Sequence, residues 1–402
     1  MEKKQMDKVN LAENIFWVGV IDWNIRDFHG YITNRGTQYN SYLIRDDKIA
    51  LVDTVKQNFT EALLENIRSI TNPDNINYII VNHVEPDHSG ALPEVAKQLK
   101  NAVIVCSERG KDAIIEHYGS EGFKFQTVKT GDTLKLGAKT LSFVEAPMLH
   151  WPDSMFTYVV EDKILMCNDA FGQHLASSQA FDDEVDPAVL MEEAGRYFAN
   201  ILTPFAPLIT RKIQEVVQMG IAPVIIAPSH GVIWRKNPGK IIQAYLDWSA
   251  GKAKNKIVIV YDTMWNSTDK MARAISEGAA SEGVEVKMCK LRAATNTEAM
   301  TEILEAKAVI VGSPTLNNQM FPTVACFMNY ATGLKPKDKL WCFFGSYGWG
   351  KGAVKGMTEE ARKAGFEIHE AAIEVRFVPD AADLARCFEL GKQMATEIKA
   401  KP

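Results

Sequence analysis

Short apolar runs separated by polar stretches follow one another along the chain, and in the first 230 residues they come in an irregular order. The earliest runs lie close together, which is typical of successive strands in hairpin-like order. Later runs are interleaved with patterns in which apolar residues recur at helical spacing. The expected strands are Ile15–Val20, Tyr39–Ile44 and Ile49–Asp53, and the expected helices lie near 57–70, 90–100 and 108–118. This mixture predicts mixed sheets faced by helices.

The rhythm changes after a helical pattern that contains Ile241–Leu246. The polar stretch Ser249–Asn255 is the best candidate for a linker, and it divides the chain into a first domain over residues 1–250 and a second over residues 256–402. In the second domain, five apolar runs alternate with helical patterns, which predicts a doubly wound five-stranded parallel sheet of flavodoxin type. These runs are Ile257–Val260, Val284–Lys287, Ala308–Val311, Leu340–Phe344 and Ile373–Phe377.

Four residues that can bind a metal ion fall within six positions, directly after the apolar run Ile76–Val81. Side chains at every second position of an extended chain face the same way, so His83, Glu85 and Asp87 can converge while His88 points toward a second ion. The plain alternative is a polar turn with two solvated histidines. Metal binding is favoured because residues of the same ligand types recur downstream.

Those downstream residues are His150, Asp169 and His230, and each follows an apolar, strand-like stretch. A site assembled from several strand-end loops would have this pattern. If Asp169 bridges two ions, each ion gains three further ligands. The expected sets are His83, Glu85 and His150 for one ion and Asp87, His88 and His230 for the other. Mixed imidazole and carboxylate ligation suits iron and manganese as well as zinc.

The run His83-Val-Glu85-Pro-Asp87-His88, with the later His, Asp and His in order, resembles the pattern of the metallo-β-lactamase superfamily. Hydrolases of that superfamily usually place a second histidine where this chain has Glu85. The version with a carboxylate resembles the flavodiiron proteins, and all seven ligand positions carry the expected residue types. The resemblance covers nearly the whole sequence, from about Asp22 to the final helix. It implies an N-terminal metallo-β-lactamase-like αββα sandwich, a flavodoxin-like domain after it, and two iron ions held by the seven residues.

Three strand-end loops of the second domain carry residue types expected around a flavin. The first is rich in hydroxyl groups and leads into a helix, an arrangement that presents backbone N–H groups and a helix dipole to a phosphate. The other two lie at the ends of the third and fourth strands, where sheets of this type bind ligands. The expected FMN-binding residues are Thr263, Met264, Trp265, Asn266, Ser267, Thr268, Ser313, Pro314, Thr315, Leu316, Asn317, Gly345, Ser346, Tyr347, Gly348 and Trp349.

The details of these loops favour FMN over other nucleotides. Tyr347 and Trp349 can contact a flat ring system, and the glycines beside them allow close backbone approach. Asn266 stands where flavodoxins usually have glycine, and asparagine tolerates the left-handed conformation better than most residues. The absence of a G-x-G-x-x-G run argues against a dinucleotide. Any one of the loops alone has a plain structural interpretation, but the three together predict FMN.

Composition narrows the class of protein further. The chain has 402 residues, which suggests two domains, and its net charge of −5 gives no reason to expect binding to nucleic acid or membranes. No apolar run approaches the length of a membrane span, and the N-terminus lacks the apolar core of a signal peptide, so we expect a cytoplasmic location. The six cysteines include no C-x-x-C pair. This excludes a rubredoxin-type centre and predicts that electrons arrive from another protein.

An iron pair and a flavin in one chain imply redox chemistry. The flavodiiron resemblance implies reduction of dioxygen to water, of nitric oxide to nitrous oxide, or both, with electrons from rubredoxin or from reduced F420, a deazaflavin. It also implies a head-to-tail homodimer, or a dimer of such dimers, that brings the FMN of one subunit beside the irons of the other. The preferred substrate and the donor stay open at this point.

Two other classes of protein compete with this interpretation. One is a zinc-dependent hydrolase of the metallo-β-lactamase superfamily with an accessory flavodoxin domain. The other is a redox sensor or electron carrier that uses FMN alone. Glu85 counts against the hydrolase, which has no need of FMN, and zinc itself has no redox chemistry.

Some polar residues outside the ligand set have weaker claims. Asp153, shortly after His150, is expected to orient a ligand histidine. His117 and His369 have polar neighbours in the sequence and are expected at the surface. The residues that could gate the pocket or deliver protons, with a structural role as the simpler interpretation, are His29, His174 and Tyr197.

Overall fold

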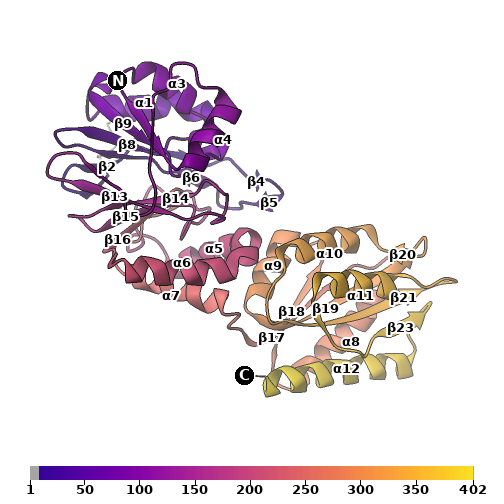
Figure 1. Ribbon diagram of the computed structural model, residues 1–402. Coiled ribbons are helices and arrows are strands. Elements are labelled where there is room, and N and C mark those ends of the chain that lie inside the picture. The colour runs from indigo at the N-terminus through magenta and orange to yellow at the C-terminus, as the bar shows by residue number, and fades with distance from the viewer. Residues whose placement is uncertain (1–8, 402) are drawn as a thin grey trace, which may run out of the picture. The chain divides into compact units, whose positions relative to one another are not determined.

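The computed structural model describes residues 9–401 and divides the chain into two compact units (Figure 1). The first unit contains the chain up to Tyr197 together with Pro207–Leu246. The second contains Phe198–Ala206 and the chain from Asp247 onward. The domain limits expected from the sequence, 1–250 and 256–402, stay a prediction. The short helical segment Phe198–Ala206, which lies far from those limits in the sequence, groups with the second unit.

The first unit is built on two sheets. One has the order β1-β2-β7-β8-β9-β10-β11, antiparallel from β1 to β8 and parallel from β8 to β11. The other has the order β12-β13-β14-β15-β16, with β15 and β16 parallel. The strands of the first sheet are β1 (Asn10–Ala12), β2 (Ile15–Trp17), β7 (Tyr42–Ile44), β8 (Ile49–Val52), β9 (Ile76–Ile80), β10 (Val103–Cys106) and β11 (Phe125–Thr127). Those of the second are β12 (Thr133–Lys135), β13 (Thr140–Glu145), β14 (Met155–Val159), β15 (Ile164–Asn168) and β16 (Ile225–Pro228).

Helices cover the outer faces of both sheets, and alternation along the strands explains the layers. On β8, Leu51 joins a core cluster with Leu63 of a covering helix, while its neighbour Val52 joins a second cluster with Phe143 of the other sheet. The helices beside the first sheet are α1 (Thr60–Arg68), α3 (Leu92–Gln98) and α4 (Glu108–Tyr118), and those beside the second are α5 (Pro187–Tyr197), α6 (Ala206–Gln218) and α7 (Pro238–Ser249) (Figure 1). The unit is an αββα sandwich, as predicted.

Two short antiparallel pairs stand apart from these sheets. β3 (Val20–Asp22) pairs with β6 (Thr37–Tyr39), and β4 (Asp27–Phe28) pairs with β5 (Tyr31–Ile32). They occupy the connection between β2 and β7, a stretch in which the sequence pattern predicted strand only at the two ends, up to Val20 and from Tyr39 onward.

The second unit is a doubly wound sheet in the order β18-β17-β19-β21, with β22 and β23 both pairing with β21. All these pairs are parallel, and the order by chain position is that of flavodoxin-type sheets. The strands are β17 (Lys254–Tyr261), β18 (Glu285–Lys290), β19 (Ala306–Leu316), β20 (Gln319–Met320), β21 (Leu340–Tyr347), β22 (Glu367–Ile368) and β23 (Ile373–Arg376). The chain order changes direction between β17 and β19, and ligands bind at such a point.

Both faces of this sheet are buried. Val309 of β19 packs with Phe327 on one face, and the next residue, Ile310, packs with Leu390 on the other. Buried parallel strands therefore give continuous apolar runs, which is why the sequence pattern located them. The helices are α8 (Ser267–Ser281), α9 (Asn296–Leu304), α10 (Pro322–Leu334), α11 (Ala353–Ala364) and α12 (Ala381–Ala400) (Figure 1).

The fold class predicted from the sequence is confirmed, with differences of detail. The predicted linker is shorter than expected, because α7 continues to Ser249 and β17 already begins at Lys254. The third strand of the second unit was expected to end before Gly312, but β19 continues to Leu316 and turns back through β20. Among the described helices, none combines the length and the apolar character that crossing a bilayer requires.

Candidate metal centre and flavin loops

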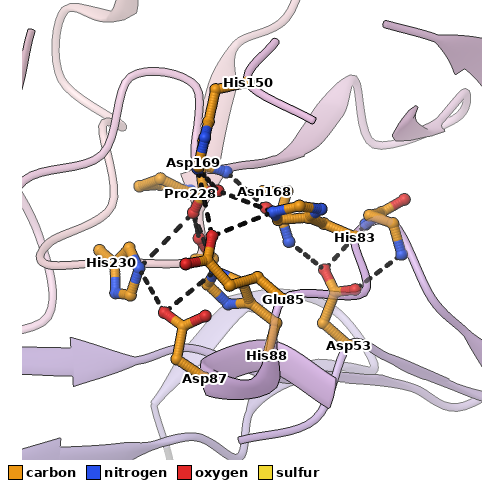
Figure 2. Close-up of polar contacts among 12 residues, drawn as sticks. Asp53, His83, Glu85, Asp87, His88, His150, Asn168, Asp169, Pro228 and His230 are labelled. Atoms are coloured by element: carbon orange, nitrogen blue, oxygen red, sulfur yellow. Dashed lines mark hydrogen bonds and ion pairs between the residues drawn. The ribbon is translucent and has the colours of Figure 1, made fainter. Parts of the chain in front are cut away.

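The structure gathers all seven predicted ligand side chains at one end of the sandwich (Figure 2). They come from loops that follow β9 and β13 and from the ends of β15 and β16, so both sheets contribute. Their ligand atoms form two groups, and within each group these atoms lie within 4.8 Å of one another. The first group is His83, Glu85, His150 and Asp169, and the second is Asp87, His88 and His230. His150 is partly exposed and the other six are buried.

Asp169 lies between the two groups and turns one oxygen toward each (Figure 2). Its Oδ2 is 3.2 Å from Nε2 of His150 and 3.6 Å from Nε2 of His83. Its Oδ1 is 2.9 Å from Nε2 of His88 and 3.5 Å from Nε2 of His230. A carboxylate in this position has the geometry of a bridge between two cations.

The loop after β9 is not extended throughout, as the sequence pattern suggested. A single helical turn, α2 (Pro86–Ser89), begins at the proline, which suits the first helical position because its φ is already fixed and it has no N–H to satisfy. The turn sends Asp87 and His88 to the second group, while His83 and Glu85, before the turn, stay in the first. The expected convergence of Asp87 with His83 and Glu85 is therefore wrong. The two groups contain the same residues as the two ligand sets that the sequence analysis expected with Asp169 as a bridging ligand.

Hydrogen bonds behind the ligand atoms fix the rings of two histidines. Nδ1 of His83 lies 3.0 Å from Oδ2 of Asp153, and since a carboxylate accepts, His83 donates from Nδ1 and leaves the lone pair of Nε2 toward the ligand group. Nδ1 of His230 likewise donates to the backbone oxygen of Gln38 at 2.9 Å. Both rings thus present the nitrogen that a metal ion needs.

Several ligand-type atoms are buried without hydrogen-bonding geometry to any described neighbour. They are both carboxylate oxygens of Asp87, both ring nitrogens of His88 and Oδ2 of Asp169. Nε2 of His88 and Oδ2 of Asp87 and of Asp169 contact other ligands as ion pairs, but no hydrogen bond within the described residues satisfies them. Buried polar atoms without hydrogen bonds cost free energy, so a cluster of them facing one space calls for a cation. The residues therefore fit a pair of metal ions, and their donor set of imidazole and carboxylate is one that iron accepts.

The charges of the cluster stabilise one another. Burial opposes the charged form of His83, but hydrogen bonds to Asp153 and Glu85 outweigh it and raise the pKa of His83 to about 10. In the same way burial is outweighed at His150, where Asp169 and Glu85 raise the pKa to about 10. Burial favours the neutral acid at Asp169, yet the surrounding histidines hold its pKa well below the usual range. Cations that enter this cluster replace protons on the histidines and find the carboxylates already ionised.

Asp53 is a residue of the site that the sequence analysis missed. Its Oδ1 accepts the backbone N–H of Asn82 at 2.7 Å, and its Oδ2 accepts the side-chain amides of Asn82 and Asn168 at 3.0 and 3.3 Å (Figure 2). These asparagines immediately precede the ligands His83 and Asp169. Burial raises the pKa of Asp53. In the sequence, Asp53 stands out only as an acidic residue at the end of the apolar run of β8, where it is interpreted as the end of a strand.

The β4–β5 hairpin brings aromatic side chains to the site. The Phe28 ring lies 5.2 Å from that of His174 and 6.2 Å from that of His230. His29 is largely exposed, and its Nε2 is 3.3 Å from Oε1 of Glu85. The hairpin therefore covers one side of the ligand cluster and places the polar side chain of His29 at the rim of the cluster.

His174 and Tyr197 are both buried beside His230. The ring of His174 is 4.7 Å from that of His230 and 5.2 Å from that of Tyr197, and its Nδ1 is 2.8 Å from the hydroxyl of Thr37. Burial and the neighbouring His230 lower the pKa of His174, which keeps the ring neutral. Of the histidines expected at the surface, His117 is exposed, whereas His369 is only partly exposed and lies 3.4 Å from Glu397.

The first flavin-type loop leads from β17 into α8 in the way a phosphate site requires. Asn266 adopts a left-handed conformation, with φ 66°, directly before Ser267 begins the helix. The first N–H groups of α8 have no partner within the helix and are available to an anion. Oγ1 of Thr263 is buried and has no hydrogen-bond partner among the described residues, so it can bind a phosphate oxygen.

The three loops are tied together by side chains. Oγ1 of Thr268 and Oγ of Ser346 are 2.9 Å apart and join the first loop to the third. At Gly345 of β21 a Cβ atom would lie 2.6 Å from the backbone oxygen of Ser313 in β19, so only glycine allows these two strands to approach this closely here. Trp265 and Trp349 are 89% and 93% exposed, which leaves both rings free to contact a ligand. The other predicted residues divide between strands and loops, although the sequence pattern placed all of them in strand-end loops. Pro314, Thr315 and Leu316 belong to the last part of β19 and Tyr347 ends β21, whereas Met264, Asn317 and Gly348 lie in the loops that follow the strands.

Fold and site together define a two-domain protein, a β-lactamase-type sandwich that can hold two metal ions joined to a flavodoxin-type domain. Residues 37–231 match the family described as ODP family beta lactamase, and residues 259–391 match the flavodoxin family. The chain is 49% identical over 393 residues to a nitric oxide reductase of Moorella thermoacetica, covering 97% of this chain and 98% of that protein.

Solved structures resemble the whole chain. The rubredoxin oxygen:oxidoreductase of Desulfovibrio gigas is 40% identical, with a TM-score of 0.96 and coverage of 98% of this chain and 99% of the other. The flavodiiron protein of Giardia intestinalis is 35% identical, with a TM-score of 0.96 and coverage of 99% and 98%. The chain belongs to the flavodiiron protein family.

Proposed function

We propose that this protein is a flavodiiron oxidoreductase that reduces dioxygen to water, nitric oxide to nitrous oxide, or both. The observation that carries the proposal is the position of Asp169, which turns one oxygen toward each of two buried ligand groups in a chain whose other unit has three flavin-type loops. The similar nitric oxide reductase and rubredoxin oxygen:oxidoreductase support this chemistry.

In this proposal the cofactors are two iron ions and one FMN. The first ion would be held by His83, Glu85 and His150 and the second by Asp87, His88 and His230, with Asp169 between the two groups as a ligand that both could share. FMN would be held by the loop after β17 and by the last residues of β19 and β21 together with the loops that follow them. When bound, the irons and the reduced flavin supply the electrons of the reaction, of which each dioxygen needs four and each pair of nitric oxide molecules needs two.

The chain's own residues orient the ligands and shape the space around them. Asp153 holds the ring of His83 by its Nδ1–H, and Asp53 holds the two loops that carry His83 and Asp169. Phe28 excludes water from the side of the cluster near His230. His29 stands at the exposed rim, where it contacts Glu85 and can pass protons between solvent and the site.

We further propose that the electron donor is a separate molecule, either rubredoxin or reduced F420. The name of the similar oxidoreductase supports rubredoxin. A head-to-tail homodimer, or a dimer of such dimers, is the proposed assembly, as the family resemblance implies. All six cysteines lie in the described part of the chain and are free, which supports the proposed cytoplasmic location.

The test is an anaerobic single turnover of the fully reduced protein, with iron, zinc and flavin quantified beforehand. Mixing with dioxygen should oxidise both iron and flavin without release of peroxide, and mixing with nitric oxide should give nitrous oxide. The faster of the two reactions identifies the physiological substrate. Zinc in place of iron, with a flavin that oxidises only slowly, would contradict the proposal and favour a hydrolase. An activity that survives replacement of His83 by alanine would favour a sensor or carrier that uses FMN alone.

A further inference from the structure

The first flavin loop is held from behind by a buried carboxylate that the flavin assignment does not use. Asp262 directly follows β17 and is fully buried. Its carboxylate accepts the backbone N–H of Thr263 at 2.7 Å, Nε–H of Arg292 at 3.2 Å and the hydroxyl of Thr323 at 2.6 Å. Three segments of the second unit therefore meet around one buried negative charge.

Arg292 also makes a direct contact with the backbone of the first flavin loop. Its Nη2 donates to the backbone oxygen of Thr263 at 2.9 Å, and its guanidinium lies 5.1 Å from the centre of the Phe321 ring. The backbone N–H of Phe321 in turn donates to Oγ of Ser313 at 2.9 Å. One arginine, in the segment after β18, thus links the first flavin loop with the second.

These contacts decide which group of Thr263 is left for a ligand. Its N–H is bound by Asp262 and its carbonyl by Arg292, while its buried hydroxyl has no partner within residues 9–401. Arginine suits this task because its planar guanidinium donates in several fixed directions at once. The same guanidinium balances the charge of Asp262, which would otherwise repel a phosphate bound at this loop.

We propose that Arg292 is a positioning residue for the 5′-phosphate of FMN. It fixes the Thr263 peptide so that the hydroxyl faces the phosphate, and it neutralises the carboxylate behind the loop. The inference rests on the FMN site proposed above, and it adds a residue outside the three loops that controls how the phosphate is recognised.

Riboflavin provides the test, because it is FMN without the phosphate. Full-length protein freed of flavin would be titrated with each compound, with quenching of flavin fluorescence as the signal. Arg292→Ala should weaken FMN binding by about tenfold or more, as expected for loss of an interaction that involves charge. The riboflavin Kd should stay within about twofold, since the ring contacts are untouched. The decisive quantity is the ratio of the two dissociation constants.

Three further variants separate charge from geometry. Arg292→Lys keeps the positive charge but cannot bind Asp262 and the backbone oxygen of Thr263 at the same time. The ratio of the FMN and riboflavin dissociation constants should therefore be intermediate. The double variant Asp262→Asn/Arg292→Ala removes the unbalanced carboxylate and should recover part of the FMN affinity. Arg362→Ala, an exposed arginine in the last turn of α11, is the matched control and should leave the ratio unchanged.

Each outcome is decisive. A loss of FMN affinity without a loss of riboflavin affinity supports the inference. An equal loss of both compounds would make Arg292 merely a structural residue, and no loss of either would remove it from the site; both results overturn the inference. Wild-type protein that binds riboflavin and FMN equally would instead overturn the phosphate site itself, so the two failures are distinguishable.

Discussion

His83 and Asp153 are joined by a hydrogen bond of 3.0 Å between Nδ1 of the imidazole and Oδ2 of the carboxylate. The same oxygen accepts the backbone N–H of Val84 at 2.7 Å, and the backbone oxygen of Asp153 accepts the hydroxyl of Ser107 at 2.8 Å. Asp153 is therefore held in place independently of the histidine that it orients. Although burial favours its neutral form, the bond to His83 keeps the pKa of Asp153 low, so the carboxylate is charged at neutral pH.

Replacement of Asp153 by asparagine should weaken iron binding by about 10–100-fold, because the ring of His83 loses its charged partner. The measurement is iron per chain after competition with a chelator. Asp162→Asn is the matched control: Asp162 pairs with Lys139 elsewhere in the same unit, so iron content should not change. An Asp153→Asn protein with full iron affinity would show that the ring of His83 is oriented by other contacts.

Replacement of His83 by alanine should remove iron and abolish oxygen reduction but leave FMN in place. The first ligand group loses one of its four side chains, whereas the flavin loops belong to the other compact unit. Iron and flavin would be quantified in the same sample. His117→Ala, at an exposed histidine, should keep both cofactors. Loss of FMN together with iron would contradict the assignment of the two cofactors to separate units.

Replacement of Thr268 by alanine should weaken FMN binding by about tenfold, because the buried hydroxyl of Ser346 loses its partner and the first and third loops come apart. Repeated turnover should slow in proportion to the loss of flavin, with iron content unchanged. Thr358→Ala, which removes a hydroxyl bonded only within α11, is the control. If iron fell with FMN in the Thr268 variant, the domain assignment would be wrong.

Lys339 should make stability depend on pH in the alkaline range. Its side chain is buried with one hydrogen bond, from Nζ to the backbone oxygen of Leu304 at 3.0 Å. Burial lowers the pKa of Lys339 to about 8, although Asp338 and Glu305 oppose this. In an unfolded chain a lysine has a pKa of about 10.4. Between these values the unfolded chain binds a proton that the folded chain does not, so folding stability rises with pH through this window.

Below that window the buried charge destabilises the folded protein fully, so Lys339→Met should stabilise it by about 3 kcal/mol at about pH 7. The advantage should shrink above about pH 8 and vanish near pH 10, as the wild-type lysine loses its proton. Denaturant unfolding of both proteins at several pH values measures the difference. A stabilisation that stays constant with pH would mean that packing, rather than charge, is responsible.

The fold could be predicted from the sequence wherever a strand is buried on both faces. β17, β19 and β21 are covered on both faces and appear as continuous apolar runs, so their alternation with helices was visible. The candidate ligands were found because histidines and acids stand directly after such runs, as at His230 after β16. Strand ends meet at one end of a sandwich, so residues distant in sequence were expected to converge.

What the sequence did not reveal depends on contacts between distant segments. The role of Asp53 depends on its hydrogen bonds to Asn82, which follows β9 of one sheet, and to Asn168, which ends β15 of the other. The helical turn after Glu85 replaced an extended loop because proline at its start favours a helix. Grouping of Phe198–Ala206 with the second unit likewise follows from tertiary packing, since the local pattern there is simply helical.

The sharing of Asp169 between the two ligand groups has a consequence for how the centre is loaded. Asp169 already turns one oxygen toward each group, and an ion bound to one of these oxygens would hold the carboxylate in the orientation that the other ion requires. The second ion then binds to a ligand set that is already arranged. Protein with a single ion should be scarce at every stage of iron titration, and a chelator should empty both positions in one phase.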